Sequence, residues 1–264
     1  MKYFELLAKT NDQPNIEIEA IKFIIEETVN KSFVYLANDE VDNLVLDRIN
    51  DYLNGKSPQY IVGHCYFYGL KLNVNETVLI PRFDTESVVD KAITEIINKN
   101  NPLVLDGFCG SGAIAIAIKS NCDCLVSGFD ISKDALSVAR SNAKLNAVDV
   151  DFFESDVFSA CTSKYDILVA NPPYIAYGDK DLDPLVLKNE PSLALYAAED
   201  GLFYYRKIME ECRSVLNEDF VIILEIPYNK TFELESLAKA NNLKFEFGKD
   251  LAGNWRVMVL RESK

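Results

Sequence analysis

The feature that most constrains the fold is a regular alternation of short apolar segments with helical segments that begins after Pro102. Strands are predicted at 103–106, 124–130, 151–155, 165–171 and 220–226, and helices from Ser111 and at 133–146, 203–216 and 231–241. Parallel strands need a crossover connection, usually a helix, so this order predicts five parallel strands in one sheet. The last two apolar segments, 244–248 and 256–260, are separated by a loop too short for a crossover helix, and we expect them to be antiparallel.

The chain ahead of this alternation is built differently. Its first 55 or so residues carry apolar residues at helical spacing and end at Gly55, which predicts a bundle of short helices. Between 59 and 81 aromatic and β-branched residues become frequent, and Gly69 separates two extended runs, which predicts a β-hairpin. Residues 84–98 are again helical. We therefore expect a helical domain at 1–58, a hairpin linker at 59–83 and an α/β domain at 84–264.

The charge of the chain limits its partners. It has 27 lysines and arginines against 41 aspartates and glutamates, a formal net charge of -14. A field of this sign repels nucleic acid, whose affinity for proteins comes largely from neutralised phosphates, so a protein substrate is favoured over DNA or RNA. No apolar run reaches the roughly 20 residues that a membrane span requires. We expect a soluble, cytoplasmic monomer without a membrane partner.

The residues that commonly bind metals do not form a recognisable site in the sequence. The six cysteines lack the paired spacing of a zinc site, and we expect them to be reduced and mostly buried in the core. The single histidine, His64, stands beside a predicted strand and is expected to be a packed or surface residue. The sequence therefore predicts no metal.

The glycine-rich turn after the first predicted parallel strand is a candidate ligand site. Ligands of open α/β sheets bind at the carboxyl ends of the strands, where this turn leads directly into a helix. Its glycines, Gly107, Gly110 and Gly112, do not form GxGxxG because Ala115 stands at the third position, so a pyrophosphate site is not specified. S-adenosylmethionine carries a carboxylate and no phosphate, and its carboxylate can bind the free amides of a helix N-terminus. The turn fits this cofactor.

Two aspartates follow the next strands of the predicted sheet. Asp130 ends the second strand, from which a carboxylate can accept hydrogen bonds from both hydroxyls of a ribose. The alternative is that Asp130 only caps the helix that follows Ile131 and Ser132. Asp156 follows the third strand and could contact an adenine, although it could also be an ordinary surface aspartate.

The fourth strand runs directly into the tetrapeptide Asn171, Pro172, Pro173 and Tyr174. An amide or aromatic amino nitrogen is a poor nucleophile because its lone pair is delocalised into a π-system. The Asn171 oxygen and the Pro172 carbonyl can each accept one N–H, which would hold the nitrogen in line with a methyl donor. The prolines keep the backbone extended, and Tyr174 can stack on a planar group. The alternative is a proline-rich loop without a catalytic role.

Several motifs together make the chain similar to a known family. They are NPPY, SPQYIVG (57–63), FYGLKLNVNETVLIPRFDTE (67–86), NEPSLAL (189–195), EDGLFYYRKI (199–208), LEI (224–226) and DLAGNWRVMV (250–259). With these motifs the sequence resembles the peptide chain release factor glutamine methyltransferases, over nearly its whole length. The resemblance implies an α/β class I Rossmann-like methyltransferase sheet of seven strands, with the last two antiparallel, behind a small helical domain and a hairpin linker.

The resemblance also implies a reaction and its residues. The methyl group of S-adenosylmethionine would pass to the glutamine side-chain amide of the Gly-Gly-Gln tripeptide in class 1 release factors, with the helical domain helping to hold that partner. The implied catalytic residues are Asn171, Pro172, Pro173 and Tyr174. The implied cofactor-binding residues are Arg82, Thr85, Asp106, Gly107, Phe108, Cys109, Gly110, Gly112, Asp130, Ile131, Asp156, Val157 and Asn171.

This sequence departs from the family pattern at a few positions. Phe108 replaces the first glycine of DxGxGSG, Phe83 and Asp84 replace a proline and a glutamate, and EIPYNK replaces EIGxxQ. Two other interpretations therefore stay open. One is a nucleic-acid amino methyltransferase of the N6-adenine type, which would use NPPY on a flipped base. The other is a noncatalytic protein of the same fold in which Phe108 blocks the cofactor.

Overall fold

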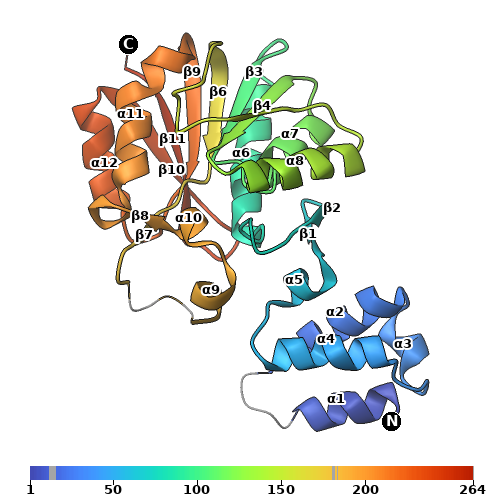
Figure 1. Ribbon diagram of the computed structural model, residues 1–264. Helices are drawn as coiled ribbons and strands as arrows, with labels where there is room; N and C mark the ends of the chain where they lie inside the picture. Colours follow the sequence, from blue (N-terminus) through green and yellow to red (C-terminus); the bar gives the residue numbers. More distant parts are fainter. Residues whose placement is uncertain (12–15, 180–181, 183, 264) are drawn as a thin grey trace. The chain divides into compact units, whose positions relative to one another are not determined.

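The computed structural model describes residues 1–11, 16–179, 182 and 184–263 (Figure 1). These residues fall into two compact units. The first contains Met1–His64 and the helix α9 (Pro184–Asn189), and the second contains Cys65–Leu182 and the chain from Glu190 onward. Within the described chain, no helix is both long and apolar enough to cross a membrane.

The first unit is a group of helices around a small apolar core. Its helices are α1 (Tyr3–Asn11), α2 (Ile18–Val29), α3 (Phe33–Leu36), α4 (Asn43–Leu53), α5 (Pro58–Val62) and α9. Ile21, Ile24, Ile25 and Val45 are fully buried, as the helical spacing of apolar residues predicts. The N-terminal helices are thus confirmed, but α9 joins them from more than 130 residues away, which the sequence pattern did not indicate.

The hairpin is shorter than predicted. The segment from Gln59 to Val62 was expected to be extended but lies in α5, which has proline at its first turn and ends at Gly63 with φ 82°. The strands are β1 (His64–Phe67) and β2 (Leu70–Asn73). Tyr68 and Gly69 between them both have positive φ, 51° and 74°, as the tight turns of two-residue hairpins require.

The second unit is built on one sheet of seven strands in the order β10-β11-β9-β6-β3-β4-β5 (Figure 1). The strands are β3 (Leu103–Gly107), β4 (Leu125–Asp130), β5 (Asp151–Glu154), β6 (Tyr165–Ala170), β9 (Leu216–Glu225), β10 (Leu243–Lys249) and β11 (Trp255–Glu262). Strands β3, β4, β5, β6 and β9 are parallel, whereas β11 pairs antiparallel with both β9 and β10. The predicted parallel sheet with an antiparallel final pair is confirmed.

Helices cover both faces of this sheet. They are α6 (Phe83–Ile96), α7 (Ala113–Asn121), α8 (Lys133–Leu145), α11 (Phe203–Val215) and α12 (Thr231–Ala240). Leu105, Leu168 and Ile222 pack with residues of α11 and α12 in one core. Their strand neighbours point to the opposite face, because side chains alternate along a strand. Figure 1 shows α11 and α12 on one side of the sheet and α7 and α8 on the other.

The connection from β6 to α11 contains short elements that the sequence analysis did not predict. In the second unit they are β7 (Ile175–Ala176), α10 (Ser192–Leu195), β8 (Tyr196–Ala197) and the 3-10 turn η1 (Glu199–Gly201). Strands β7 and β8 pair in parallel, although residues 177–195 lie between them along the chain. This pairing brings the EDG segment back to the NPPY segment.

Candidate active site

The glycine-rich turn after β3 has a backbone that few other sequences could adopt. Gly110 and Gly112 have positive φ, 52° and 79°. A side chain at Gly112 would place its Cβ 2.9 Å from the Phe152 ring and 3.1 Å from Ala139, so the close packing of α7 and α8 depends on this glycine. The Cys109 amide donates to the Phe129 carbonyl at 2.9 Å and ties the turn to β4. The turn therefore holds the N-terminus of α7 in a fixed place.

Phe108 occupies the position at which the sequence departs from glycine. It has φ 58°, a conformation that is rare for a residue with a bulky side chain. Its ring packs against Tyr204, with ring centroids 5.0 Å apart, and against Phe129 at 5.5 Å. This aromatic packing offsets the backbone strain and fixes the ring as one wall of a cavity, rather than leaving it free to fill that cavity.

A cavity of about 320 Å³ lies at the carboxyl ends of the parallel strands. This volume is within the range of small-molecule sites, and the location is that of ligands in open α/β sheets. The predicted site residues that line it are Phe108, Gly110, Asp130, Ile131, Asp156, Val157, Asn171 and Pro173. The predicted residues that do not line it are Arg82, Thr85, Asp106, Gly107, Cys109, Gly112, Pro172 and Tyr174. Lining residues that the sequence analysis missed include Leu79, Ser132, Ser155, Pro191, Leu193 and Tyr204.

Asp130 lines the cavity and accepts hydrogen bonds from backbone amides ahead of α8, whereas the N-cap of α8 is Ser132. One carboxylate oxygen accepts the Ser132 amide and the other accepts the Gly110 amide, each at 2.9 Å. Burial raises the pKa of Asp130, and these backbone hydrogen bonds act in the opposite direction. Asp130 therefore joins the turn to β4 while it lines the cavity.

Asp106 lies behind the turn and is fully buried. One of its oxygens accepts the Ala115 amide at 3.0 Å, and the other has no hydrogen-bond partner. Burial raises the pKa of Asp106 to about 8. An unpaired buried acceptor is costly, so a cationic group or a water that reached this oxygen would bind favourably. The amino group of an amino-acid ligand is such a group.

Replacing Asp106 with asparagine should stabilise the ligand-free protein near neutral pH. Between the ordinary pKa of 3.8 and about 8, the unfolded chain has lost a proton that the folded chain keeps, so stability falls as pH rises through this window. Asp106→Asn removes this penalty, and we expect about 1–3 kcal/mol more free energy of unfolding at pH 7. Urea denaturation at pH 7 and pH 4 checks this, because the gain should vanish at pH 4. An equal effect at both values would contradict it.

Asn171 belongs to a hydrogen-bonded group that includes a residue the sequence analysis did not single out. Ala170 pairs with Leu224, so Asn171 and Glu225 follow at the same level of neighbouring strands. The Asn171 side-chain nitrogen lies 3.5 Å from the Thr85 hydroxyl, which donates to Glu225. The Tyr174 hydroxyl donates to the other Glu225 oxygen at 3.3 Å. Thr85, predicted to bind cofactor, is buried and contacts Glu225 instead.

Arg82 lies outside the cavity and is bonded to Glu190. The Glu190 side chain is only 2% exposed, and its second oxygen has no hydrogen-bond partner. The next residues, Pro191, Leu193 and Ala194, line the cavity. Arg82 is therefore linked to the segment that forms one wall of the cavity.

Comparison with known proteins agrees with this geometry. Residues 85–187 match the family described as methyltransferase small domain. A release factor glutamine methyltransferase from Streptococcus pneumoniae is 41% identical over 224 residues, 81% of this chain and 80% of that protein. The protein of the same name from Haemophilus influenzae is 34% identical over 274 residues, 96% of this chain and 94% of that protein.

The chain belongs to the release factor glutamine methyltransferase family. Its fold is also that of a methyltransferase from Pyrococcus furiosus, with a TM-score of 0.58 at 16% identity over 82% of this chain and 98% of that one. NPPY and the glycine-rich turn lie at one edge of the sheet because they follow β6 and β3, which are neighbouring parallel strands.

Gly201, the glycine of the EDG motif, lets the backbone of this motif pack closely against the NPPY segment. It has φ 85°, and a Cβ on it would lie 2.2 Å from the Tyr174 carbonyl oxygen, a separation that no real contact has. The backbone of η1 therefore reaches Tyr174 only because residue 201 is a glycine. In this family member, the second motif of the β6–α11 connection holds the first one in place.

Replacing Gly201 with alanine should displace the NPPY backbone and lower stability. Gly253→Ala is a matched control, because Gly253 also has φ 85° but nothing lies within 4 Å of the Cβ position. Both variants bear the backbone strain, about 1–2 kcal/mol, and Gly201→Ala adds the clash. We expect Gly201→Ala to lose at least about 1 kcal/mol more free energy of unfolding than Gly253→Ala. Equal losses in denaturant titrations would show that the close approach is unimportant.

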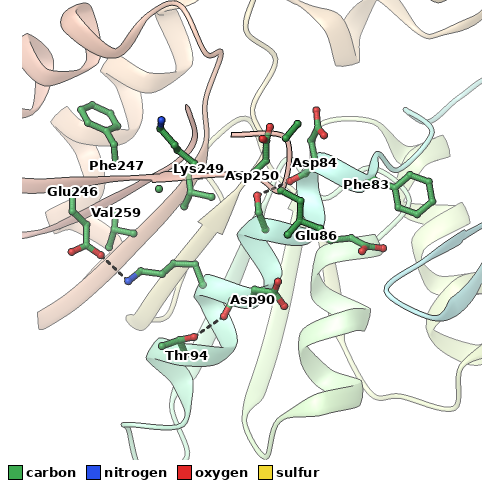
Figure 2. A pocket seen from close by; sticks show the side chains of 16 residues that line it. Phe83, Asp84, Glu86, Asp90, Thr94, Glu246, Phe247, Lys249, Asp250 and Val259 are labelled. Atoms are coloured by element: carbon green, nitrogen blue, oxygen red, sulfur yellow. Dashed lines mark hydrogen bonds and ion pairs between the residues drawn. The ribbon is translucent and has the colours of Figure 1, made fainter. Parts of the chain in front are cut away.

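A second, wider cavity of about 850 Å³ lies between α6 and the β10–β11 hairpin (Figure 2). Figure 2 shows Glu246 and Phe247 on one side of it and Asp84 and Glu86 on the other. Lys91 binds Glu246, and the Tyr68 amide donates to Glu86, so these acidic groups already have partners. None of the implied catalytic and cofactor-binding residues named above lines this cavity, although Phe83, Asp84 and Glu86, whose segment the resemblance implies lies near the cofactor, do. The smaller cavity, at the carboxyl ends of the strands, remains the candidate active site.

Proposed function

We propose that this protein transfers a methyl group from S-adenosylmethionine to the side-chain amide nitrogen of the glutamine in the Gly-Gly-Gln tripeptide of class 1 release factors, in the cytoplasm. The observation that carries the proposal is that Asn171 and Pro173 line the same cavity as Asp130 and Gly110. A nucleoside-binding wall and an amide-binding wall thus face one space. Family membership supplies the substrate class.

The residues present fit the cofactor. Asp130 lines the cavity and can accept hydrogen bonds from ribose hydroxyls, and Asp156 and Val157 line the same cavity and suit an adenine. The turn that leads into α7 reaches the cavity at Phe108 and Gly110, beside a helix N-terminus, where a carboxylate can bind. When bound, S-adenosylmethionine supplies an electrophilic methyl group on a sulfonium.

The NPPY segment then orients the substrate. The Asn171 side-chain oxygen, at the cavity wall, accepts one N–H of the glutamine amide. The second acceptor that the family resemblance implies is the Pro172 carbonyl, although Pro172 does not line the cavity in this structure. Together they would aim the nitrogen lone pair at the methyl carbon. With S-adenosylmethionine bound, the methyl group would pass from its sulfur to this nitrogen. The two acceptors stabilise the positive charge that develops on the nitrogen, and the extra proton leaves to water. A general base is not required, and His64, which pairs with Glu27 at 2.7 Å, belongs to the other compact unit.

The test is methyl transfer by the purified protein with labelled S-adenosylmethionine. Substrates are a class 1 release factor, the same factor with its tripeptide glutamine changed to alanine, and total RNA and DNA from one cell extract. We expect label on the intact factor, at the glutamine in peptide mass spectra, and none on the alanine variant. Label on nucleic acid alone would replace this function with that of a nucleic-acid methyltransferase. Cofactor binding without any transfer would favour a noncatalytic paralogue.

A further inference from the structure

Glu225 lies at the centre of the hydrogen bonds behind the NPPY segment. It ends β9, is 2% exposed, and receives one hydroxyl on each carboxylate oxygen, from Thr85 on α6 and from Tyr174. Burial raises the pKa of Glu225, while both hydroxyls and the positive charge of Arg256 act in the opposite direction. Both ends of the NPPY segment are therefore connected to one buried carboxylate.

The hydrogen bonds in this group have a definite direction. An ionised carboxylate only accepts hydrogen bonds, so the single hydroxyl proton of Thr85 points to Glu225. Toward Asn171 the Thr85 oxygen can then offer only a lone pair. The group of Asn171 that faces Thr85 must be its NH2, which lies 3.5 Å away. The side-chain oxygen of Asn171 is left to point away from Thr85.

We propose that Glu225 is a positioning residue that fixes, through Thr85, which end of the Asn171 amide faces the substrate. Because Asn171 lines the cavity, its oxygen is the group presented there. An oxygen at this point accepts an N–H, whereas an NH2 would repel the hydrogens of an amide nitrogen. The long contact between Asn171 and Thr85 shortens when a substrate engages the oxygen, as catalytic hydrogen bonds often do on binding.

The chemistry of the accepted substrate follows from this arrangement. A site that presents only oxygens to the reacting nitrogen selects a group with two N–H donors, which is a primary amide or an amino group. It rejects a hydroxyl or a carboxylate, which would leave an acceptor unpaired or repelled. The inference deepens the proposed function and rests on it.

The experiment compares three substitutions on α6. Thr85→Val is nearly isosteric and removes the hydroxyl, so we expect single-turnover methyl transfer to the release factor to fall at least about 10-fold. Thr85→Ser keeps the hydroxyl and should recover most of that loss. Thr94→Val is the matched control, since Thr94 only bonds the Asp90 carbonyl one turn back on the same helix and should leave the rate unchanged. Cofactor affinity, measured by calorimetry, should stay within a few-fold in all three.

Glu225→Gln tests the carboxylate itself. The NH2 of a glutamine can donate to the Thr85 hydroxyl, which would reverse the direction of the hydrogen bonds from Asn171 to residue 225. We therefore expect a similar loss of rate, with cofactor affinity retained. If Glu225 acted as a neutral acid, glutamine would imitate it and the rate would stay near wild type, which would overturn the proposal. If this variant does not fold, Thr85→Val and Thr85→Ser still test the proposal, because a wild-type rate in Thr85→Val would also contradict the positioning role.

A double substitution separates a positioning role from a structural one. Thr85→Val should add nothing further to Asn171→Ala, because both act through the same amide, whereas independent structural effects would add. The outcomes also separate this inference from the proposed function. Full activity in Asn171→Ala contradicts the proposed site itself. A large loss in Asn171→Ala with wild-type rates in Thr85→Val and Glu225→Gln contradicts only the positioning role.

Discussion

Asn171→Ala should slow methyl transfer about 100-fold or more, while cofactor affinity stays within a few-fold. Asn171 provides one of the two proposed acceptors for the amide N–H groups and lies at the cavity wall formed by the end of β6. Its loss removes both the alignment of the nitrogen and the stabilisation of the developing charge. Single-turnover assays at saturating cofactor and release factor measure this step without binding or product release.

Two results of these measurements would contradict the role proposed for Asn171. If Asn171→Ala transfers methyl at nearly the wild-type rate, NPPY is a proline-rich loop without a catalytic role. A rate loss that comes with an equal loss of cofactor affinity would instead move Asn171 to the cofactor side of the cavity. Calorimetric titration of the same variant distinguishes these results.

Asp130→Ala should weaken binding of S-adenosylmethionine by about 1–3 kcal/mol, the cost of leaving polar ligand groups without a partner. That corresponds to a rise of roughly 5- to 150-fold in Kd. The substitution also removes the acceptor of the Gly110 and Ser132 amides, so thermal unfolding without ligand must be measured beside the calorimetry.

Asp134→Ala is the control for Asp130→Ala. Asp134 also lines the cavity and carries the same charge, but it is exposed at the first turn of α8. A general electrostatic effect of the cavity would appear in both variants. We expect a clear change of affinity only for Asp130→Ala, and unchanged affinity there would remove Asp130 from the ribose site.

The sheet could be predicted from the sequence because its strands are buried on both faces. Val221, Ile222, Ile223 and Leu224 are an unbroken apolar run, which is what a parallel strand covered by helices requires. Helix α5 was mispredicted for the related reason that Tyr60, Ile61 and Val62 are typical of strands. The residues at the two ends favour a helix in this segment. Pro58 suits the first helical turn, and Gly63 adopts the left-handed conformation that ends the helix.

Other parts of the candidate site have no periodic signal in the sequence and are marked only by the motifs NEPSLAL, EDGLFYYRKI and LEI. Strands β7 and β8 have two residues each and α10 has four, too few for a periodic pattern. In the sequence, Glu225 is simply a polar residue at the end of an apolar run. Only the register between β9 and β6 places it beside Asn171. Thr85 illustrates the same limit, because its partner Glu225 lies 140 residues away in the chain.

Helix α9 makes completion of the first compact unit a late event in the synthesis of the chain. Asn189 donates to the Gly55 carbonyl at 2.8 Å, and Lys188 donates to the Asn54 carbonyl, so two acceptors after α4 are satisfied from 134 residues downstream. Domains generally form in the order in which they emerge from the ribosome. Here the N-terminal helices emerge first without these partners, and water must occupy the two carbonyls until residue 189 has been made. We therefore expect the helical unit to reach its final form only after β3, β4, β5 and β6 have been made, although β9, β10 and β11 are still to come.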